Sequence, residues 1–358
     1  MRDRDTHAAL PNYEITGDWA DLSMVPDLAS SWAHNGVVIT AGGELIGFHA
    51  GQLVAFDVHG EVIRTVTPGL TEGHGLTLVR EGNEEYLWIS DPGFVFVSTV
   101  DDGDEMWAPL FGKGIDRVTR DPRVAKLTLE GEILLELPLP PMDPESPQGM
   151  MGQYCPCGTA VDEERFGGSG DIWVADGYGS SLVHRFDKYG IHRLTLTGDE
   201  GGGRFVCPHA VFISRRACKA PELYIADREN KRIQVYDLEG VYLRTVGANF
   251  LSSPSAFAQW GDVLVVAELY SRLALLDGDD NLVGYIGADP DAKEGQGWPE
   301  RPGWPNALAE DGHVEPPHLP NADRFNSPHS VTVDADGNLY VSEWLLGGRY
   351  SKLTVLGN

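Results

Sequence analysis

An internal repeat constrains the fold of this chain more than any other feature of its sequence. The clearest copy begins at Pro208 and contains the segments PHAVFI and ELYIADRENKRIQVYDLEGVYLRTVG. Further copies begin at Pro156, Pro254 and Pro328, and a weaker pair begins at Gly36 and Gly73. A repeat of this kind cannot bury its hydrophobic face alone, so copies stack on their neighbours.

Each copy consists of short β-rich runs separated by turns such as DADGN, DLEG and DKYG. Such turns reverse the chain between antiparallel strands. Four strands in a period of roughly 40 to 50 residues are typical of a propeller blade. No amphipathic helix of useful length separates the runs. The sequence therefore predicts an all-β fold, a six-bladed β-propeller, formed by residues 1–358 as one domain.

The ends of the chain suggest how the ring closes. The last copy ends at Asn358 with three clear strands, and Tyr13–Trp19 resembles the outer strand of a blade. We therefore expect the N-terminal strand to complete the sixth blade and remove a free sheet edge. Insertions interrupt the repeat at about residues 94–123, 138–154 and 288–325. The last carries Trp298, Trp304, His313 and His318, and we expect it to be partly ordered and to cover one mouth of the ring.

Composition narrows the classes of partner. The 43 glycines and 23 prolines suit many strands and turns. The net charge of −27 argues against nucleic acid and anionic membranes as partners. No apolar run approaches a membrane span, and the first 21 residues lack the apolar stretch of a secretion signal. Four cysteines do not make a disulfide scaffold. We expect a cytoplasmic protein.

One position, just after the Pro or Gly that opens each repeat, carries the candidate chemistry. It is occupied by His74, Gly158, His209, Ser255 and His329. Equivalent positions of innermost strands lie at equal height around a propeller channel, so histidines on blades two, four and six would converge. Three imidazoles with an open fourth position form a catalytic zinc site. The alternative is that each histidine hydrogen-bonds within its own blade. His49, His59, His184 and His192 are interpreted as surface or packing residues.

A second recurring position, at the end of the second strand, holds acids. They are Asp91, Asp176, Asp227, Glu268 and Glu343. Because an acid occurs in nearly every blade, we interpret these residues as structural, capping the following turn by accepting backbone N–H bonds.

Two residues just beyond those acids have no counterpart in the other repeats. Tyr178 lies in ADGYGSS and Arg228 lies in ADREN, and both are expected at the face of the ring that carries the histidines. A phenol near a cation can act as a base because its pKa is lowered. A guanidinium can bind a carboxylate with two hydrogen bonds.

These segments resemble the repeats of peptidyl-α-hydroxyglycine α-amidating lyase and its bacterial NHL relatives. The resemblance covers most of the chain from about Tyr13, and its most specific parts are the three spaced histidines with DGY and ADREN. It implies zinc on His74, His209 and His329, a catalytic role for Tyr178 and an active-site role for Arg228. It also implies metal-assisted cleavage of a carbinolamide C–N bond, with Tyr178 taking the hydroxyl proton.

The chain departs from the family at three positions. Ala50 stands where the family has an arginine, Ser327 replaces a methionine, and Ser330 replaces an acid. Ala50 weakens the expectation that the substrate ends in the same carboxylate, and Ser330 argues against the family's structural calcium. The family's cysteines beside DGY and ADREN are also absent, which fits a reduced compartment.

The leading hypothesis is a metal-dependent lyase, with zinc or another divalent transition metal. It would cleave a C–N or C–O bond next to a hydroxyl-bearing carbon in a small polar substrate. A non-catalytic NHL propeller that binds a ligand or protein is the alternative. A propeller lactonase ranks third, because such enzymes hold calcium with Glu, Asn and Asp rather than with His, Gly and Ser.

Overall fold

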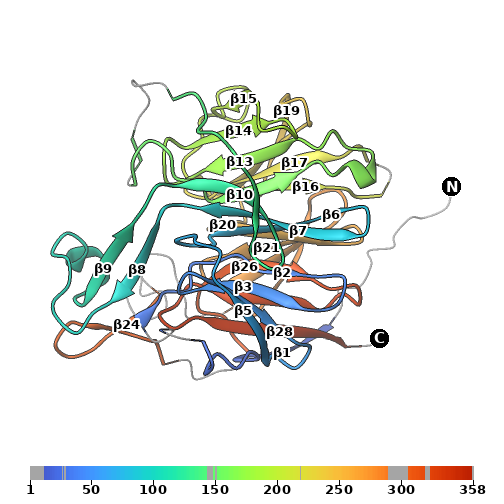
Figure 1. The fold of residues 1–358 in the computed structure, drawn as a ribbon. Helices are drawn as coiled ribbons and strands as arrows, with labels where there is room; N and C mark the ends of the chain where they lie inside the picture. Colours follow the sequence, from blue (N-terminus) through green and yellow to red (C-terminus); the bar gives the residue numbers. More distant parts are fainter. Residues whose placement is uncertain are drawn as a thin grey trace.

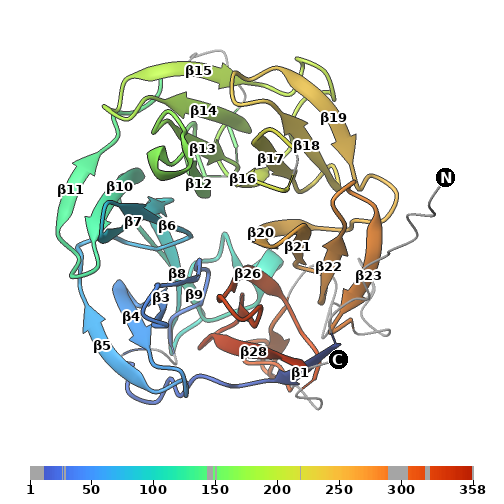
Figure 2. The same ribbon diagram turned by 90° about the vertical axis from the view of Figure 1, so that its right-hand side faces the viewer.

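A computed structural model gives the structure of this chain. It describes residues 12–25, 27, 30–142, 148–149, 151–217, 219–288, 305–318 and 323–356. Within these residues, six four-stranded antiparallel sheets form blades around a central axis (Figure 1, Figure 2). The predicted all-β, six-bladed propeller is confirmed.

The first three blades follow the chain from the centre of the ring to its rim. Blade 1 consists of β2 (Val38–Ile39), β3 (Leu45–His49), β4 (Gln52–Phe56) and β5 (Val62–Val66). Blade 2 consists of β6 (Gly75–Glu81), β7 (Glu84–Asp91), β10 (Arg123–Thr128) and β11 (Ile133–Glu136). Blade 3 consists of β12 (Gly158–Val161), β13 (Ile172–Asp176), β14 (Leu182–Phe186) and β15 (His192–Leu196).

The remaining blades include the one that closes the ring. Blade 4 consists of β16 (Pro208–Ser214), β17 (Glu222–Asp227), β18 (Arg232–Tyr236) and β19 (Tyr242–Val246). Blade 5 consists of β20 (Pro254–Trp260), β21 (Val263–Glu268), β22 (Arg272–Leu276) and β23 (Leu282–Ile286). Blade 6 consists of β26 (Pro328–Val333), β27 (Leu339–Glu343), β28 (Arg349–Leu356) and the N-terminal β1 (Asn12–Thr16). Because β1 pairs with β28, from Asn12 with Leu356 to Thr16 with Lys352, the predicted closure by an N-terminal strand is confirmed.

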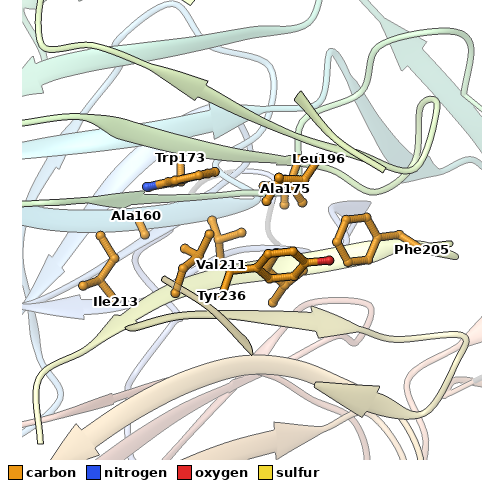
Figure 3. Packing of buried hydrophobic residues seen from close by; sticks show 11 residues of the cluster. Ala160, Trp173, Ala175, Leu196, Phe205, Val211, Ile213 and Tyr236 are labelled. Atoms are coloured by element: carbon orange, nitrogen blue, oxygen red, sulfur yellow. The ribbon is translucent and has the colours of Figure 1, made fainter. Parts of the chain in front are cut away.

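The core lies between neighbouring blades rather than at the axis. The second strand of blade 3, β13, is buried throughout because side chains of both its faces pack against adjacent blades. Figure 3 shows Trp173 and Ala175 of that strand packed against Val211, Ile213 and Tyr236 of blade 4. The outer strand β19 instead alternates between half-buried and exposed positions, with one face turned to solvent.

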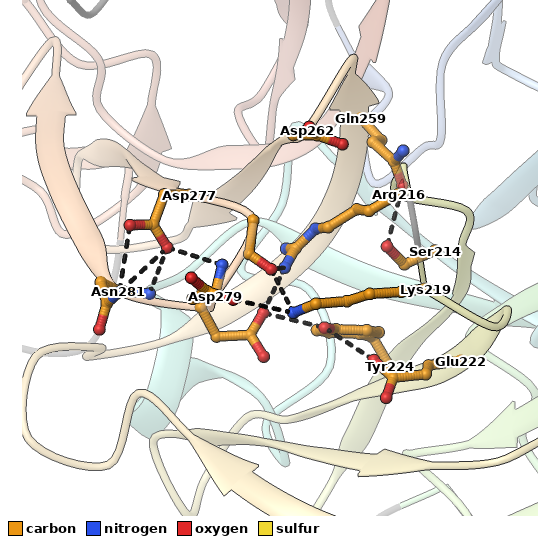
Figure 4. Close-up of polar contacts among 12 residues, drawn as sticks. Ser214, Arg216, Lys219, Glu222, Tyr224, Gln259, Asp262, Asp277, Asp279 and Asn281 are labelled. Carbon is orange, nitrogen blue, oxygen red and sulfur yellow. Dashed lines mark hydrogen bonds and ion pairs between the residues drawn. The ribbon is translucent and has the colours of Figure 1, made fainter. Parts of the chain in front are cut away.

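A polar network joins blades 4 and 5. Arg216, after β16, donates to the Asp280 carboxylate at 2.6 Å, and Tyr224 donates to the same oxygen at 2.9 Å. Lys219 donates to the backbone carbonyl of Gly278 in the same turn of blade 5 (Figure 4). Since Arg216 and Asp280 are both buried, each charge depends on the other for compensation.

Two of the expected insertions meet on one face of the ring. Residues 94–123 form β8 (Phe94–Ser98), the short helix α1 (Ala108–Phe111) and β9 (Ile115–Thr119), which project from one side in Figure 1. The later insertion contributes β24 (Ala307–Leu308) and β25 (Val314–Glu315), and the His313 backbone bridges to Lys113. Trp298 and Trp304 lie outside the described residues. Among the described residues, no helix is long and apolar enough to span a membrane.

The turn after β12 forms the short 3-10 helix η2 (Glu164–Phe166) at the opposite end of the inner strands. The strand that follows it, β13, runs back toward the end that carries the insertions, and the antiparallel β14 runs away from that end again. The ring thus has one end covered by inserted segments and another end bordered by this turn.

Candidate metal centre

Four buried histidines converge at the covered end of the axis. They are His34, His74, His209 and His329, and one ring nitrogen of each lies within 4.8 Å of those of the others. His74, His209 and His329 begin the inner strands of blades 2, 4 and 6, so the repeat places them at one height. The structure therefore brings the three histidines named from the sequence together. It adds His34, which the sequence analysis missed.

Backbone carbonyls of neighbouring blades orient three of these rings. The Nδ1 atom of His74 lies 2.6 Å from the Cys157 carbonyl of blade 3, and Nδ1 of His209 lies 2.8 Å from the Ser255 carbonyl of blade 5. Nδ1 of His329 lies 3.1 Å from the Asn35 carbonyl, at the start of blade 1. A carbonyl only accepts, so in each neutral ring Nδ1 carries the proton and Nε2 offers a lone pair to the centre. The alternative of hydrogen bonds within each blade is wrong.

His34 comes from a position one residue out of register with the other three. In blade 1, Ile39 pairs with the first residue of β3, as Val333 pairs with the first residue of β27. Ile39 therefore corresponds to Val333. Asn35, four residues before Ile39, then corresponds to His329, four residues before Val333, and His34 precedes Asn35. The Asn35 carbonyl accepts the hydrogen bond that orients the His329 ring. The His34 ring itself places a nitrogen beside those of the other three histidines. The only sequence signal was a histidine two residues before Gly36, where the first repeat begins.

The Tyr178 hydroxyl lies at the centre of the site. It is 3.0 Å from Nε2 of His34 and of His209, and 3.3 Å from Nε2 of His74. The Arg228 guanidinium donates to the same oxygen at 3.2 Å, and its Cζ lies 5.3 Å from the Tyr178 ring centroid. The structure thus brings together all five residues that the sequence analysis selected.

The loop that carries Tyr178 is held by the Pro- and Met-rich segment before blade 3. Ser180 donates its hydroxyl to the Gln153 carbonyl at 2.8 Å, and Asp176 accepts a bond from the Cys155 N–H at 2.6 Å. A Cβ on Gly149 would meet the Tyr178 carbonyl at 2.3 Å, so only glycine permits this approach. The insertion near residues 138–154 therefore supports the position of Tyr178.

Aromatic side chains cover the site on the side of the insertions. The His34 ring stacks on Trp344, with centroids 5.2 Å apart, and Phe94 of β8 lies 6.1 Å from the Tyr178 ring. Trp32 and Phe96 extend this apolar layer. Because little water reaches the site, charges and dipoles there interact strongly.

Burial sets the protonation of the site. It lowers the pKa of all four histidines, that of His329 to about 3, and the neighbouring rings lower the pKa of His34 and His74 further. Burial also raises the pKa of Tyr178 well above its ordinary value, and the Arg228 charge opposes that rise. The resting state is therefore four neutral imidazoles around a phenol beside one fixed positive charge.

The donor set fits a divalent transition metal. The Nε2 atoms of His74 and His329 are 3.2 Å apart, and both are lone-pair acceptors that repel unless a proton or cation lies between them. Metal–nitrogen bonds of about 2.0–2.1 Å place adjacent ligand nitrogens roughly 3.0–3.4 Å apart in common shells. The anchored Nδ1 atoms match the outer hydrogen bonds that orient metal-binding histidines. The part of the chain that the structure describes can therefore hold a metal ion at this point.

The recurring acids anchor the loops that carry the site. Glu343 accepts from the N–H groups of Asn326 and Ser327, and Asp91 accepts from those of Thr71 and Glu72. Asp227 accepts from the Val206 N–H. The predicted structural role is confirmed, but these acids mainly fix the loop before each inner strand. Asp91 and Asp176 also accept from N–H groups of the following turn, those of Gly93 and Ser180, and Asp227 accepts from the Asn230 side-chain amide there.

The three positions that depart from the amidating lyases have structural partners here. Ala50 lies in the β3–β4 turn with a positive φ of 47°. The Ser327 hydroxyl donates to the Trp344 carbonyl, and the Ser330 hydroxyl accepts from the Val37 N–H. Ser330 therefore ties blade 6 to the start of blade 1.

The other histidines lie away from the centre. His49 is buried with Nε2 2.8 Å from the Tyr350 hydroxyl, and His184 is buried with Nδ1 3.0 Å from the Thr195 hydroxyl. His59 lies exposed in a turn. Nε2 of His313 lies 3.2 Å from the Asp101 carbonyl, joining the two insertions. Cys155, Cys157 and Cys207 are buried free thiols.

Comparisons with known proteins agree with the fold. No protein-family model matches the chain. Over 129 residues, 33% of its length, the chain is 36% identical to human (Homo sapiens) NHL repeat-containing protein 3, of which the match covers 35%. A streptogramin B lyase structure aligns over 96% of this chain and 98% of that one, with a TM-score of 0.55 and 14% identity.

A virginiamycin B lyase from Staphylococcus aureus also aligns, over 96% of this chain and 100% of that one. Its TM-score is 0.51 and its identity 14%, so this likeness, too, concerns the fold. The chain is therefore a six-bladed β-propeller that is homologous, over about a third of its length, to an NHL-repeat protein.

Proposed function

We propose that this chain is a metal-dependent lyase whose active site is the His34–His74–His209–His329 centre with Tyr178 and Arg228. The observation that carries the proposal is the half-buried Tyr178 hydroxyl, which contacts three imidazole Nε2 atoms and a guanidinium. A cluster of titratable groups whose pKa values are strongly shifted is typical of catalytic sites. The fold that this chain shares with a streptogramin B lyase and a virginiamycin B lyase supports the reaction class.

The four histidines would hold the metal through Nε2. A bound divalent cation would supply Lewis acidity and lower the pKa of nearby oxygen acids. The proposed metal is zinc or another divalent transition metal, since imidazole suits several of them. Structural calcium is not part of the proposal.

Tyr178 and Arg228 would carry the proton and charge. In the proposed reaction, the phenolate of Tyr178 accepts the proton of a substrate hydroxyl, and the released O–H electron pair forms a carbonyl. The adjacent C–N or C–O bond breaks, and the leaving atom takes up that proton from the Tyr178 hydroxyl, which restores the phenolate. Arg228 opposes the rise in the pKa of Tyr178 that burial causes, and it presents a fixed positive charge to developing negative charge. The substrate is a small polar molecule with a hydroxyl next to the bond that breaks.

Metal analysis of protein purified without chelator tests the site. We expect one metal ion per chain, lost in His209→Ala and retained in the matched variant His59→Ala, whose histidine is exposed in a turn. A chain without stoichiometric metal, or a His209→Ala variant that keeps it, would contradict the proposed ligand set.

Turnover of hydroxyglycine-type and other hydroxylated substrates then tests the chemistry. Tyr178→Phe keeps the ring but removes the proton carrier, so turnover should fall by about 10²–10⁴-fold while the metal is retained. A non-catalytic binding propeller predicts instead that the His74/His329 double variant keeps its cellular function. Unchanged function in that double variant would favour binding over catalysis.

A further inference from the structure

A second compartment lies on the other side of the histidine rings. The inner strands enclose a cavity of about 660 Å³ along the axis, with His74, His209 and His329 among its lining residues. Its lining includes neither Tyr178 nor Arg228. The three ring centroids are 4.6, 4.8 and 5.0 Å apart, which leaves no passage between them for a molecule. The rings therefore form a floor that separates the cavity from the side chains of Tyr178 and Arg228.

The cavity is a long tube whose lining combines apolar side chains of the inner strands with polar ones. It extends along β16 from His209 to Arg215, six residues of extended chain or roughly 20 Å. Leu76, Leu78, Val161 and Phe212 line it and are only half-buried, so apolar surface faces the cavity. Its volume lies within the range of ordinary small-molecule pockets, roughly 300–1,000 Å³. A hydrocarbon chain that covers these apolar side chains would gain free energy by removing apolar surface from water.

The far mouth of the tube carries cationic groups. Phe166 of η2 is exposed there, and the guanidinium carbons of Arg165 and Arg215 lie 4.3 and 5.2 Å from its ring centroid. Arg165 pairs with Glu163, and Arg215 pairs with Asp162. The Arg215 Nε atom is nonetheless buried without a hydrogen-bond partner among the described residues. An unused guanidinium donor beside this tube suits an anionic head group.

We propose that this tube is a binding site for a slender amphiphile with a hydrocarbon chain and a carboxylate head. The chain lies among the apolar side chains of the inner strands, with its end toward the histidine floor. The carboxylate lies at the mouth and accepts from Arg215. This site is separate from the side chains of Tyr178 and Arg228 and does not depend on the proposed lyase activity.

Titration calorimetry with hexanoate, octanoate, decanoate and dodecanoate, all below their micelle concentrations, tests the proposal. Affinity should rise about four-fold for each added methylene, because each buries further apolar surface. Dodecanol should bind at least about ten-fold more weakly than dodecanoate, since it lacks the charge that Arg215 binds. No binding of dodecanoate, or equal binding of the alcohol, would overturn the proposal.

Matched variants locate the site. Thr332 lines the tube and belongs to none of the apolar core clusters, so Thr332→Phe should fill the tube and abolish dodecanoate binding. Thr65→Phe makes the same change on the exposed outer strand of blade 1 and should bind normally. Arg215→Gln, which leaves the packed strands untouched, should reduce binding of dodecanoate but not of dodecanol. Equal dodecanoate binding in Thr332→Phe and Thr65→Phe would overturn the assignment of the binding site to the tube. The metal content of the same variants, measured in parallel, tests the metal centre separately.

Discussion

At the scale of single residues, the His34 ring reaches the same point as three histidines from another repeat position. The ring of His34 contacts the Tyr178 hydroxyl, whereas the backbone carbonyl of the adjacent Asn35 accepts the hydrogen bond that orients His329. If all four imidazoles bound one zinc ion tetrahedrally, no open position would remain for a substrate. If all four imidazoles bind the metal and a substrate also reaches it, the metal must accept five or six ligands.

Replacing His34 tests whether its ring is a ligand. His34→Ala should weaken metal affinity by at least about ten-fold, the lower end of what loss of outer-shell partners alone costs. Competition with a chelator of known affinity measures the change, and His59→Ala is the control. Affinity equal to that of the unmodified chain would assign His34 to positioning Tyr178 instead.

The buried histidines predict a stability that depends on pH. Burial lowers the pKa of His184 to about 3, whereas the unfolded chain titrates near 6.5. The unfolded state therefore binds more protons below pH 6.5, so stability present above this pH is lost as the pH falls. Between pH 7 and 4.5 this one residue should cost about 2–3 kcal/mol in free energy of unfolding.

Urea unfolding of His184→Gln at the two pH values isolates that contribution. The variant should lose less stability on acidification than the unmodified chain, and His59→Gln should behave like the unmodified chain. Identical pH profiles for His184→Gln and the unmodified chain would contradict a neutral buried imidazole at this position.

At the scale of the strand and loop, the acid at the end of each second strand connects folding to the site. Glu343 of β27 binds the N–H groups of Asn326 and Ser327, just before His329, and pairs with Arg349 at 2.8 Å. All of these groups are buried. The acid is therefore a positioning residue for the histidine loop and the partner of a buried cation.

Substitution of Glu343 should affect both stability and the metal centre. Glu343→Gln keeps the volume but removes the charge that Arg349 faces, which should cost about 3 kcal/mol of unfolding free energy. Metal affinity should also fall, because the loop before His329 loses its anchor. Asp336→Asn, at an exposed turn of the same blade, should change neither quantity. If Glu343→Gln lost stability but kept its metal affinity, Glu343 would not be a positioning residue for the metal centre.

These elements also show what the sequence could predict. The repeat predicted the blades, and the closing strand followed from a sixth copy one strand short. The recurring position predicted that His74, His209 and His329 would meet, because equivalent residues of a ring share one height. His34 could not be found in this way, since it lies one residue out of register. The carbonyl partners of the rings belong to neighbouring blades, and those contacts appear only once the ring is assembled.

At the scale of the whole molecule, one antiparallel pair closes the ring. Strand β1 covers the edge of β28, and Tyr13 and Ile15 pack against the core of blades 5 and 6. Closure keeps blade 6, and with it His329, in place beside blade 1. The site therefore depends on the integrity of the whole ring.

Removing the closing strand tests that dependence. A chain lacking residues 1–16 should unfold at a lower temperature and associate in solution, because the exposed β28 edge can pair with another chain. A chain lacking only residues 1–11 keeps β1 and should behave as the unmodified chain. Thermal unfolding and size-exclusion chromatography measure both effects, and equal behaviour of the two truncations would contradict closure by β1.

The most direct test of the central claim is a crystal structure with anomalous diffraction data across the absorption edges of candidate metals. We expect one anomalous peak on the propeller axis, about 2.0–2.2 Å from the Nε2 atoms of the four histidines and beside the Tyr178 oxygen. The proposed metal centre would be contradicted if protein purified without chelator showed no anomalous peak on the axis, or if the metal were bound away from these histidines.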